Sequence, residues 1–277
     1  MMKSTHTLGT AFFLNAAFSL VELAGGIVTG STAILADAVH DFGDALSIGL
    51  SCWFEKRSKH QADEQYTLGY ARYTVLGGVL SALMLFFGSV AMIVHAIGRL
   101  QNPVELQYSG MMAVAIIGVF VNGAAAWRTH RGQTLNEKAV FWHLLEDVLG
   151  WLVVLIGAAV MCVTDWAWLD PLLSIGVATF VAIHAVGHLK EGTAIFLEKA
   201  PPDIHTGELL AQIETVDGIR CVEALYVWSL DGVEHCAAVH LHTDDEAEAV
   251  KAQVRAVLES YGIVKHTIET TVAENVR

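Results

Sequence analysis

The sequence is poor in charged residues for a chain of its length. Aspartate, glutamate, lysine and arginine make up 16% of the 277 residues, whereas a soluble globular domain carries roughly 25%. Hydrophobic residues make up 54%, and the mean hydropathy is +0.48. This composition argues against a soluble globular protein and favours a chain that lies largely within a lipid bilayer.

The signatures of several other protein classes are also missing from the sequence. Its four cysteines (Cys52, Cys162, Cys221 and Cys236) form no Cys-x-x-Cys pair, which argues against a disulfide framework and a cysteine-type zinc site. The net charge is −13 and no stripe of lysine and arginine occurs, so we expect no nucleic-acid partner. No catalytic nucleophile motif or glycine-rich phosphate loop is present. We therefore predict that the protein is not an enzyme and does not use ATP.

Charge is distributed unevenly along the chain. Residues 201–277 hold 14 acidic and five basic residues, whereas the first 200 residues hold 15 and 11. The composition changes abruptly after Pro201-Pro202, which marks a domain boundary. We predict a membrane domain over residues 1–200 and a soluble, acidic domain over residues 201–277.

The first 200 residues contain six apolar stretches, each near the length of roughly 20 residues that a membrane-spanning helix needs. They cover about residues 8–28, 32–54, 72–97, 109–128, 139–163 and 170–190. An alternative for the first stretch is a secretory signal peptide, but Asn15 and Glu22 interrupt it and no clear cleavage site follows. Basic residues flank the even-numbered connections and the end of the sixth stretch: Lys56, Arg57, Lys59, Arg72, Arg128, Arg131, Lys138, Lys190 and Lys199. The positive-inside tendency then places both termini in the cytoplasm.

Ionisable residues occur within two of these stretches, where burial in lipid is costly and usually serves a function. His40 and Asp44 lie four residues apart in the second stretch, as do His143 and Asp147 in the fifth. A spacing of four places two side chains on one face of a helix. If the two faces meet, they offer two imidazoles and two carboxylates, a set that suits tetrahedral Zn²⁺ rather than Mg²⁺ or Ca²⁺. Cd²⁺, Co²⁺, Mn²⁺ and Fe²⁺ also accept such donors, and hydrogen-bonded helix packing is the alternative reading of either pair.

Three further acidic residues lie near these pairs. Asp37 precedes His40 by three residues and is placed to orient the imidazole from outside the ligand shell. Asp41 points about 100° away from His40 around the helix, and Glu146 is likewise off the face of His143 and Asp147. We assign all three to the surroundings of the metal or to its path, with contacts to water or to a neighbouring helix as the alternative.

The sequence resembles the cation diffusion facilitator family along nearly its whole length. The resemblance rests on the two His-x-x-x-Asp motifs and on several runs around them: Asn15, Phe18, Glu22 and Gly26; Gly30-Ser31 to Asp37; Asn122; and Trp168-Leu169-Asp170-Pro171-Leu172-Leu173. It implies an α-helical membrane protein with six transmembrane helices and a small cytoplasmic domain that resembles metallochaperones. It also implies a homodimer in the bacterial inner membrane that exports zinc from the cytoplasm in exchange for protons.

The same resemblance assigns the transport site to His40, Asp44, His143 and Asp147. Members with histidine at the position of His40 tend to favour zinc over cadmium. Some members place a second metal site in the connection after the second span, built from aspartate and histidine. This chain has Asp63 there, but Tyr66 and Tyr70 occupy the expected histidine positions. We therefore expect this second site to be absent or weak.

Histidine also offers a route for coupling metal to protons. A free imidazole titrates near pH 6.5, so protons and zinc compete for the same lone pair. Alternating access between the two sides of the membrane would convert this competition into zinc/proton antiport. Two other classes fit less well. A membrane metallo-hydrolase would need an open coordination position and a general base, and a metal sensor with a membrane anchor would not need six spans.

The sequence of residues 201–277 predicts a small domain whose helices and strands follow in the order α-β-β-α-β. Helices are expected at 203–215 and 245–261, and strands at 219–229, 234–243 and 264–272, with Asp231-Gly232 as a hairpin turn. His240 and His242 lie two residues apart and share one face of a strand. We take His240 as a candidate metal ligand of this domain, with an ordinary polar residue as the alternative.

Overall fold

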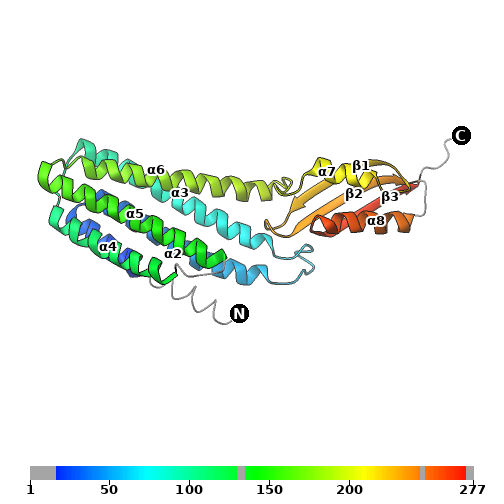
Figure 1. Ribbon diagram of the computed structural model, residues 1–277, viewed down its shortest axis with the longest axis horizontal. Helices are drawn as coiled ribbons and strands as arrows, with labels where there is room; N and C mark the ends of the chain where they lie inside the picture. Colours follow the sequence, from blue (N-terminus) through cyan, green and yellow to red (C-terminus); the bar gives the residue numbers. More distant parts are fainter. Residues whose placement is uncertain (1–16, 130–134, 244–246, 273–277) are drawn as a thin grey trace. The chain divides into compact units, whose positions relative to one another are not determined.

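A computed structural model describes residues 17–129, 135–243 and 247–272, without the side chains of residues 47–48, 51–52, 128–129, 135–143 and 272. A first helix covers Ala17–Thr29. The other helices and strands follow in the order shown in Figure 1: α2 (Thr32–Ser58), α3 (Arg72–Gln101), α4 (Tyr108–Thr129), α5 (Leu135–Thr164), α6 (Leu169–Phe196), α7 (Thr206–Glu214), β1 (Ile219–Ser229), β2 (His235–Thr243), α8 (Ala247–Ser260) and β3 (Ile263–Val272).

The described residues form two compact units. The helical unit comprises those of Met1–Leu50 and Leu80–His188. The sheet unit comprises those of Ser51–Val79 and Leu189–Arg277, and so contains the connection between α2 and α3 together with the C-terminal sheet.

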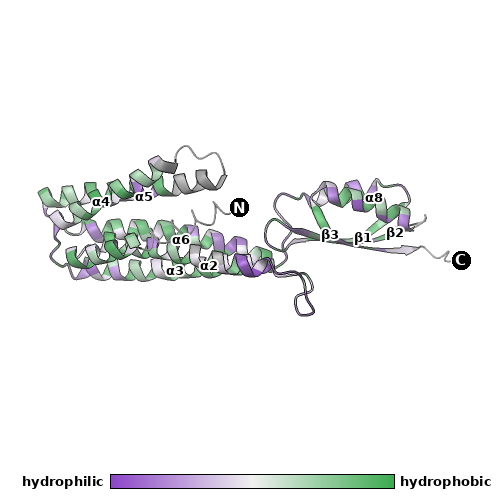
Figure 2. Ribbon diagram, turned by 90° about the horizontal axis from the view of Figure 1, so that it is seen from below, coloured by the Kyte–Doolittle hydropathy of each residue, from purple (hydrophilic) through white to green (hydrophobic). Residues whose placement is uncertain are grey.

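Four described helices are long and apolar enough to cross a membrane: Arg72–Gln101, Tyr108–Trp127, Leu144–Thr164 and Leu169–Phe196. Their apolar character is evident in Figure 2, where α3 to α6 are mostly green. The described first helix is shorter. Helix α2 has 27 residues, but its first half carries Asp37, His40, Asp41 and Asp44. These ionisable residues make α2 more polar than the four apolar helices.

The core of the helical unit forms around Trp151 of α5, which is fully buried. It packs with buried residues of α2, α4 and α5, namely Ala33, Ile34, Met111, Ala115, Val154, Ala158 and Met161. Gly118 of α4 lies directly against the indole, and a Cβ atom at this position would stand 2.3 Å from Trp151 Cδ2. Glycine therefore lets α4 and α5 approach closely, one helical turn from Asp147 on α5.

Alanine at Gly118 is expected to destabilise the protein. The added methyl group overlaps the buried indole, and such overpacking costs about 1–3 kcal/mol. Gly150→Ala is the matched control, because a Cβ atom on Gly150 meets nothing within 4 Å. Thermal unfolding in detergent micelles should show a lower midpoint for Gly118→Ala and little change for Gly150→Ala. Equal midpoints for the two variants would contradict this packing.

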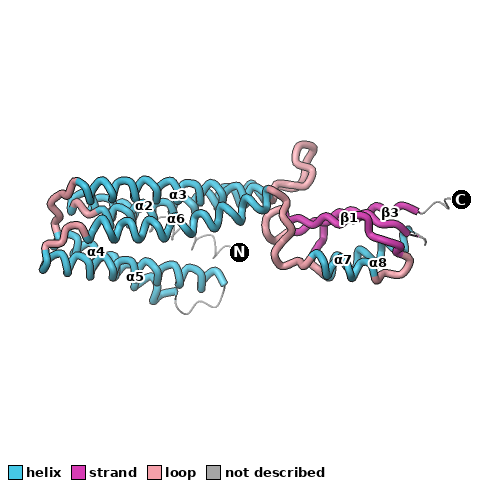
Figure 3. Tube along the Cα trace, turned by 90° about the horizontal axis from the view of Figure 1, so that it is seen from above, coloured by secondary structure: helices cyan, strands magenta, loops and turns pink. Residues whose placement is uncertain are grey.

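The sheet unit contains a three-stranded sheet of order β1-β2-β3. Strands β1 and β2 are antiparallel, whereas β2 and β3 are parallel and are joined through α8, because parallel neighbours need a crossover connection. Figure 3 shows α7 and α8 on the same face of the sheet. Apolar residues of both helices and the sheet fill this interface: Leu209, Ile213, Val239, Leu241, Val250, Val254, Leu258 and Ile263.

The element order of the C-terminal residues agrees with the predicted α-β-β-α-β order, and the boundaries agree within a few residues. The predicted hairpin turn is confirmed. Gly232 has a φ of +93°, a conformation that favours glycine. The Asp231 carboxylate accepts hydrogen bonds from the backbone N–H groups of Val233 and Glu234, at 2.9 and 2.7 Å. Local turn chemistry therefore explains why this boundary was readable from the sequence.

Candidate metal centre

Three side chains that could together ligate a metal ion converge inside the helical unit. His40 and Asp41 come from α2 and Asp147 from α5, and one ligand atom of each lies within 4.8 Å of the other two. Atoms that share a zinc ion lie roughly 3–4 Å apart, since each stands about 2.0–2.2 Å from the ion. Small side-chain rotations would therefore bring the three ligands onto one ion. Among the described residues this is the only such group of three or more.

The burial of these side chains fits a site inside a bilayer. Asp41 and Asp147 are 2% and 9% exposed, and His40 is half-buried. His40 also borders a small, mainly apolar pocket between α2, α3 and α6, lined by Ala36, Val39, Leu85, Ser89, Met92, Ala178 and Val181. The apolar lining limits the access of water to the imidazole from that side and strengthens electrostatic interactions at the site.

Further carboxylates surround this group. Asp44 Oδ2 lies 3.8 Å from His40 Nε2. Asp41 interacts electrostatically with Glu22 of the first helix, with Asp37 and Asp44 of α2, and with Asp147 of α5. Glu22 is fully buried, and its carboxyl group interacts with that of Asp41. Five carboxyl groups therefore share one buried region.

The sequence supplies little basic countercharge to this region. No lysine or arginine occurs in residues 4–55 or 139–189, which include the described first helix and the parts of α2 and α5 that hold the carboxylates. Closely spaced carboxylates in a low-dielectric interior repel one another unless protons or metal ions compensate their charge. The arrangement is therefore chemically suited to bind a cation and to release it when protons replace it.

The side chains of this group come from α2 and α5. His40 and Asp44 lie on one face of α2, and Asp147 of α5 reaches the group that also contains His40. The spacing along α2 predicts Asp41 in the surroundings of the metal or along its path. The structure places Asp41 within the group, because α5 approaches α2 where Asp41 as well as His40 can face it. Glu22, which in the sequence interrupts the first apolar stretch and belongs to a family motif, adds another buried carboxylate.

The remaining candidates of the membrane domain lie at different places. Asp37 is half-buried and lies within electrostatic range of Asp44 and Asp147. Glu146 is exposed and does not join the group. His143 belongs to α5, four residues before Asp147, but its side chain lies outside the described residues.

The connection between α2 and α3 engages Asp63 in hydrogen bonds. Its carboxylate accepts the backbone N–H groups of Gln65 and Tyr66, at 2.9 and 2.8 Å, and the hydroxyl of Tyr70. The hydrogen bond from Tyr70 is the main reason why the pKa of Asp63 lies below its usual value. The Arg57 guanidinium stands over the Tyr70 ring, 5.0 Å from its centroid. Protein donors thus occupy the carboxylate that a metal in this connection would need.

In the sheet unit, His240 projects from β2 toward an acidic neighbour. Its Nδ1 atom lies 3.6 Å from Glu269 Oε2 of β3, and 42% of its side chain is exposed. His242, two residues further along β2, lies 3.4 Å from Glu223 of β1. Each imidazole therefore has its own carboxylate partner. A metal-binding role for His240 stays a prediction.

Comparison with known proteins gives these residues a family context. Residues 8–197 match the family model of the cation efflux transmembrane domain. The chain is 29% identical over 268 residues to the cadmium, cobalt and zinc/H(+)-K(+) antiporter of Bacillus subtilis strain 168, covering 94% of this chain and 86% of that protein. It is 28% identical over 274 residues to the metal cation efflux system protein CzcD of Cupriavidus metallidurans, covering 97% and 87%.

A third relative carries a narrower name. The zinc transporter ZitB of Escherichia coli strain K12 is 29% identical over 262 residues, which cover 92% of this chain and 83% of that protein. The family model matches well over half of the chain, and it covers all of the described residues that form the buried acidic group. The chain therefore belongs to the cation diffusion facilitator family of membrane transporters.

Proposed function

We propose that the protein exports divalent metal ions, with Zn²⁺ as its main substrate, from the cytoplasm in exchange for protons. The buried convergence of His40, Asp41 and Asp147 carries this proposal. One imidazole nitrogen among carboxylate oxygens suits zinc and related transition metals better than the all-oxygen shells of Mg²⁺ and Ca²⁺. The names of the similar proteins, which mention zinc, cadmium and cobalt, support the same substrate class.

The proposed transport site extends the observed group by its neighbours along the two helices. Asp44 lies within 3.8 Å of His40 and would add a second carboxylate from α2. His143 lies one helical turn before Asp147 and would add a second imidazole from α5. Asp37 and Glu22 would supply negative charge around the ligands, so that the site attracts a doubly charged ion.

The proposed topology has six transmembrane helices in the inner membrane of a bacterium, with both termini in the cytoplasm. Four helices meet the length and hydropathy that a span requires, and the first helix and α2 would complete the set. Lys56 and Arg57 in the last turn of α2 support a cytoplasmic end for that helix. Residues 1–200 would then form the transport domain, and residues 201–277 a cytoplasmic domain that takes part in a homodimer.

Transport would proceed by alternating access to the buried site. When the site opens to the cytoplasm, deprotonated His40 and the nearby carboxylates bind the ion. When it opens to the other side, protons compete for the imidazole lone pair and for the carboxylates, and the ion leaves. The protein with its metal-free, protonated site would then return to the state that is open to the cytoplasm, because the bound protons compensate the negative charge of the carboxylates.

Metal flux into proteoliposomes tests this function. We expect the purified protein to move Zn²⁺ faster than protein-free vesicles do, with Cd²⁺ and Co²⁺ as weaker substrates and no measurable movement of Mg²⁺. The measurement is fluorescence of a metal-sensitive dye inside the vesicles, with each ion added at the same free concentration. Mg²⁺ flux equal to Zn²⁺ flux, or no Zn²⁺ flux above the vesicle background, would refute the proposal.

A further inference from the structure

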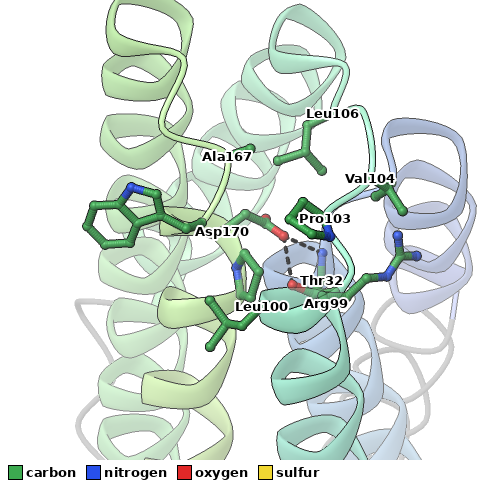
Figure 4. A pocket seen from close by; sticks show the side chains of 11 residues that line it. Thr32, Arg99, Leu100, Pro103, Val104, Leu106, Ala167 and Asp170 are labelled. Atoms are coloured by element: carbon green, nitrogen blue, oxygen red, sulfur yellow. Dashed lines mark hydrogen bonds between the residues drawn. The ribbon is translucent and has the colours of Figure 1, made fainter.

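A buried carboxylate from α6 holds the beginning of α2. Asp170 is the second residue of α6 and is 1% exposed. Its Oδ2 atom accepts hydrogen bonds from the backbone N–H and the hydroxyl of Thr32, both at 2.7 Å. Its Oδ1 atom accepts the hydroxyl of Ser31 and the backbone N–H of Ala33, the latter at 3.3 Å. Figure 4 shows Asp170 facing Thr32, with Pro103 and Leu100 beside them.

These contacts form a helix cap that is supplied by another helix. The first backbone N–H groups of a helix have no partner within it, and side chains next to the helix in sequence usually satisfy them. Ser31 does so in the ordinary way, because its hydroxyl accepts the N–H of Ile34 at 3.1 Å. Asp170 adds a negative charge to the same end, where the helix dipole favours it. Four donors therefore fix one carboxylate and, with it, the first turn of α2.

The turn before α2 leaves this end little freedom. Only Gly30 and Ser31 separate the first helix from α2, and Gly30 has a φ of +74°. A Cβ atom on Gly30 would stand 3.2 Å from the carbonyl oxygen of Glu105. The carbonyl of Thr29 accepts the N–H of Gln107 at 3.0 Å. The start of α2 is thus tied both to α6 and to the segment that precedes α4.

The anchored end lies close to the metal centre along a continuous helix. His40 follows Thr32 by eight residues, which is roughly 12 Å at 1.5 Å per residue. Each residue also turns the helix by about 100°, so any slip or unwinding of the first turn rotates His40 and Asp41 away from Asp147. The position of the ligands depends on where and at what angle α2 begins.

We propose that Asp170 is a positioning residue for the metal centre. Asp170 of α6 caps the N-terminus of α2. It thereby fixes the position of α2 along its axis and its rotation about that axis, and these two determine how His40 and Asp41 face Asp147. It does not bind the metal itself. This inference rests on the proposed function, because it concerns the geometry of that same site.

Equilibrium zinc binding to the folded protein tests this role. We expect Asp170→Asn to bind Zn²⁺ about 10-fold more weakly than the wild type, which is the scale seen when a residue supporting a metal ligand is removed. Thr32→Val removes one hydroxyl donor at nearly constant shape and should weaken binding by a smaller factor. Thr32→Ser keeps the hydroxyl and should restore the wild-type affinity. Binding is measured with a competing chromophoric chelator on the monodisperse fraction from size exclusion.

The outcomes separate positioning from a purely structural role. A purely structural role would lower the yield of folded protein and leave the zinc affinity of the folded fraction unchanged, and that result would overturn the inference. If Asp170→Asn does not fold, the comparison of Thr32→Val with Thr32→Ser decides in the same way. Asp147→Asn serves as the reference for the site: wild-type zinc affinity in this variant would refute the proposed site and the positioning role together. Lost binding in Asp147→Asn with normal binding in Asp170→Asn and Thr32→Val would refute the positioning role alone.

Discussion

Alanine in place of Asp147 is expected to reduce zinc flux to the level of protein-free vesicles. Asp147 is the only described side chain of α5 in the buried group, so its removal leaves α2 without that partner across the site. Loss of a residue that merely supports a ligand costs about 10–100-fold in metal affinity, and loss of a ligand should cost at least about 100-fold. The measurement is initial zinc flux per folded protein in proteoliposomes.

The neighbouring residue provides a matched control for this variant. Glu146 precedes Asp147 on the same helix, is exposed and stands outside the group. Glu146→Ala also removes one carboxylate from α5 and should retain most of the flux. If both variants lose transport equally, general loss of negative charge on α5 explains the defect and the assignment of Asp147 as a ligand fails. Normal flux in Asp147→Ala would remove it from the site.

A proton gradient is expected to drive zinc in the opposite direction. The five carboxyl groups around His40 would repel one another strongly if all of them were charged after the metal leaves. We therefore expect protons to enter as zinc departs, and we expect each zinc ion that binds to protonated ligands to release protons. A gradient of about two pH units should accelerate zinc movement by about 10-fold, which corresponds to about half of the roughly 2.7 kcal/mol per proton that it supplies.

Two simultaneous readings check the coupling. A zinc-sensitive dye follows the metal, and a pH-sensitive dye inside the same vesicles should report proton movement in the opposite direction as zinc is added. A protonophore should abolish the acceleration while leaving the protein folded. Zinc flux that ignores the gradient, with no accompanying change of internal pH, would identify facilitated diffusion instead of antiport.

The features that the sequence predicted well are local ones. The turn at Asp231-Gly232 and the apolar faces of α7 and α8 depend on residues within a few positions of each other, and the order of the C-terminal elements could be read from them. The four-residue spacing of His40 and Asp44 likewise places both side chains on one face of an α-helix, wherever that helix packs. Such patterns show which side chains point the same way along one element.

The features that the sequence could not supply depend on how one helix meets another. The spacing of residues along α2 does not place Asp41 on the face of His40 and Asp44. It also does not indicate from which direction α5 approaches α2, so the position of Asp41 within the group could not be predicted. The burial of Glu22 requires knowledge of which side of the first helix packs inward. The bond between Thr32 and Asp170 joins residues 138 positions apart, and Gly118 matters only because Trp151 lies against it.

That long separation has a consequence for how the protein is made. The first turn of α2 leaves the ribosome well before Asp170 is synthesised, by 138 residues. At about 5–20 residues per second, the helix waits roughly 7–28 s for the carboxylate that caps it. The fixed start of α2 is thus among the last features of the helical unit to form. An unfinished chain carries the first three acidic side chains of α2 without the geometry that arranges them, so we expect metal binding to become possible only after α6 has been made.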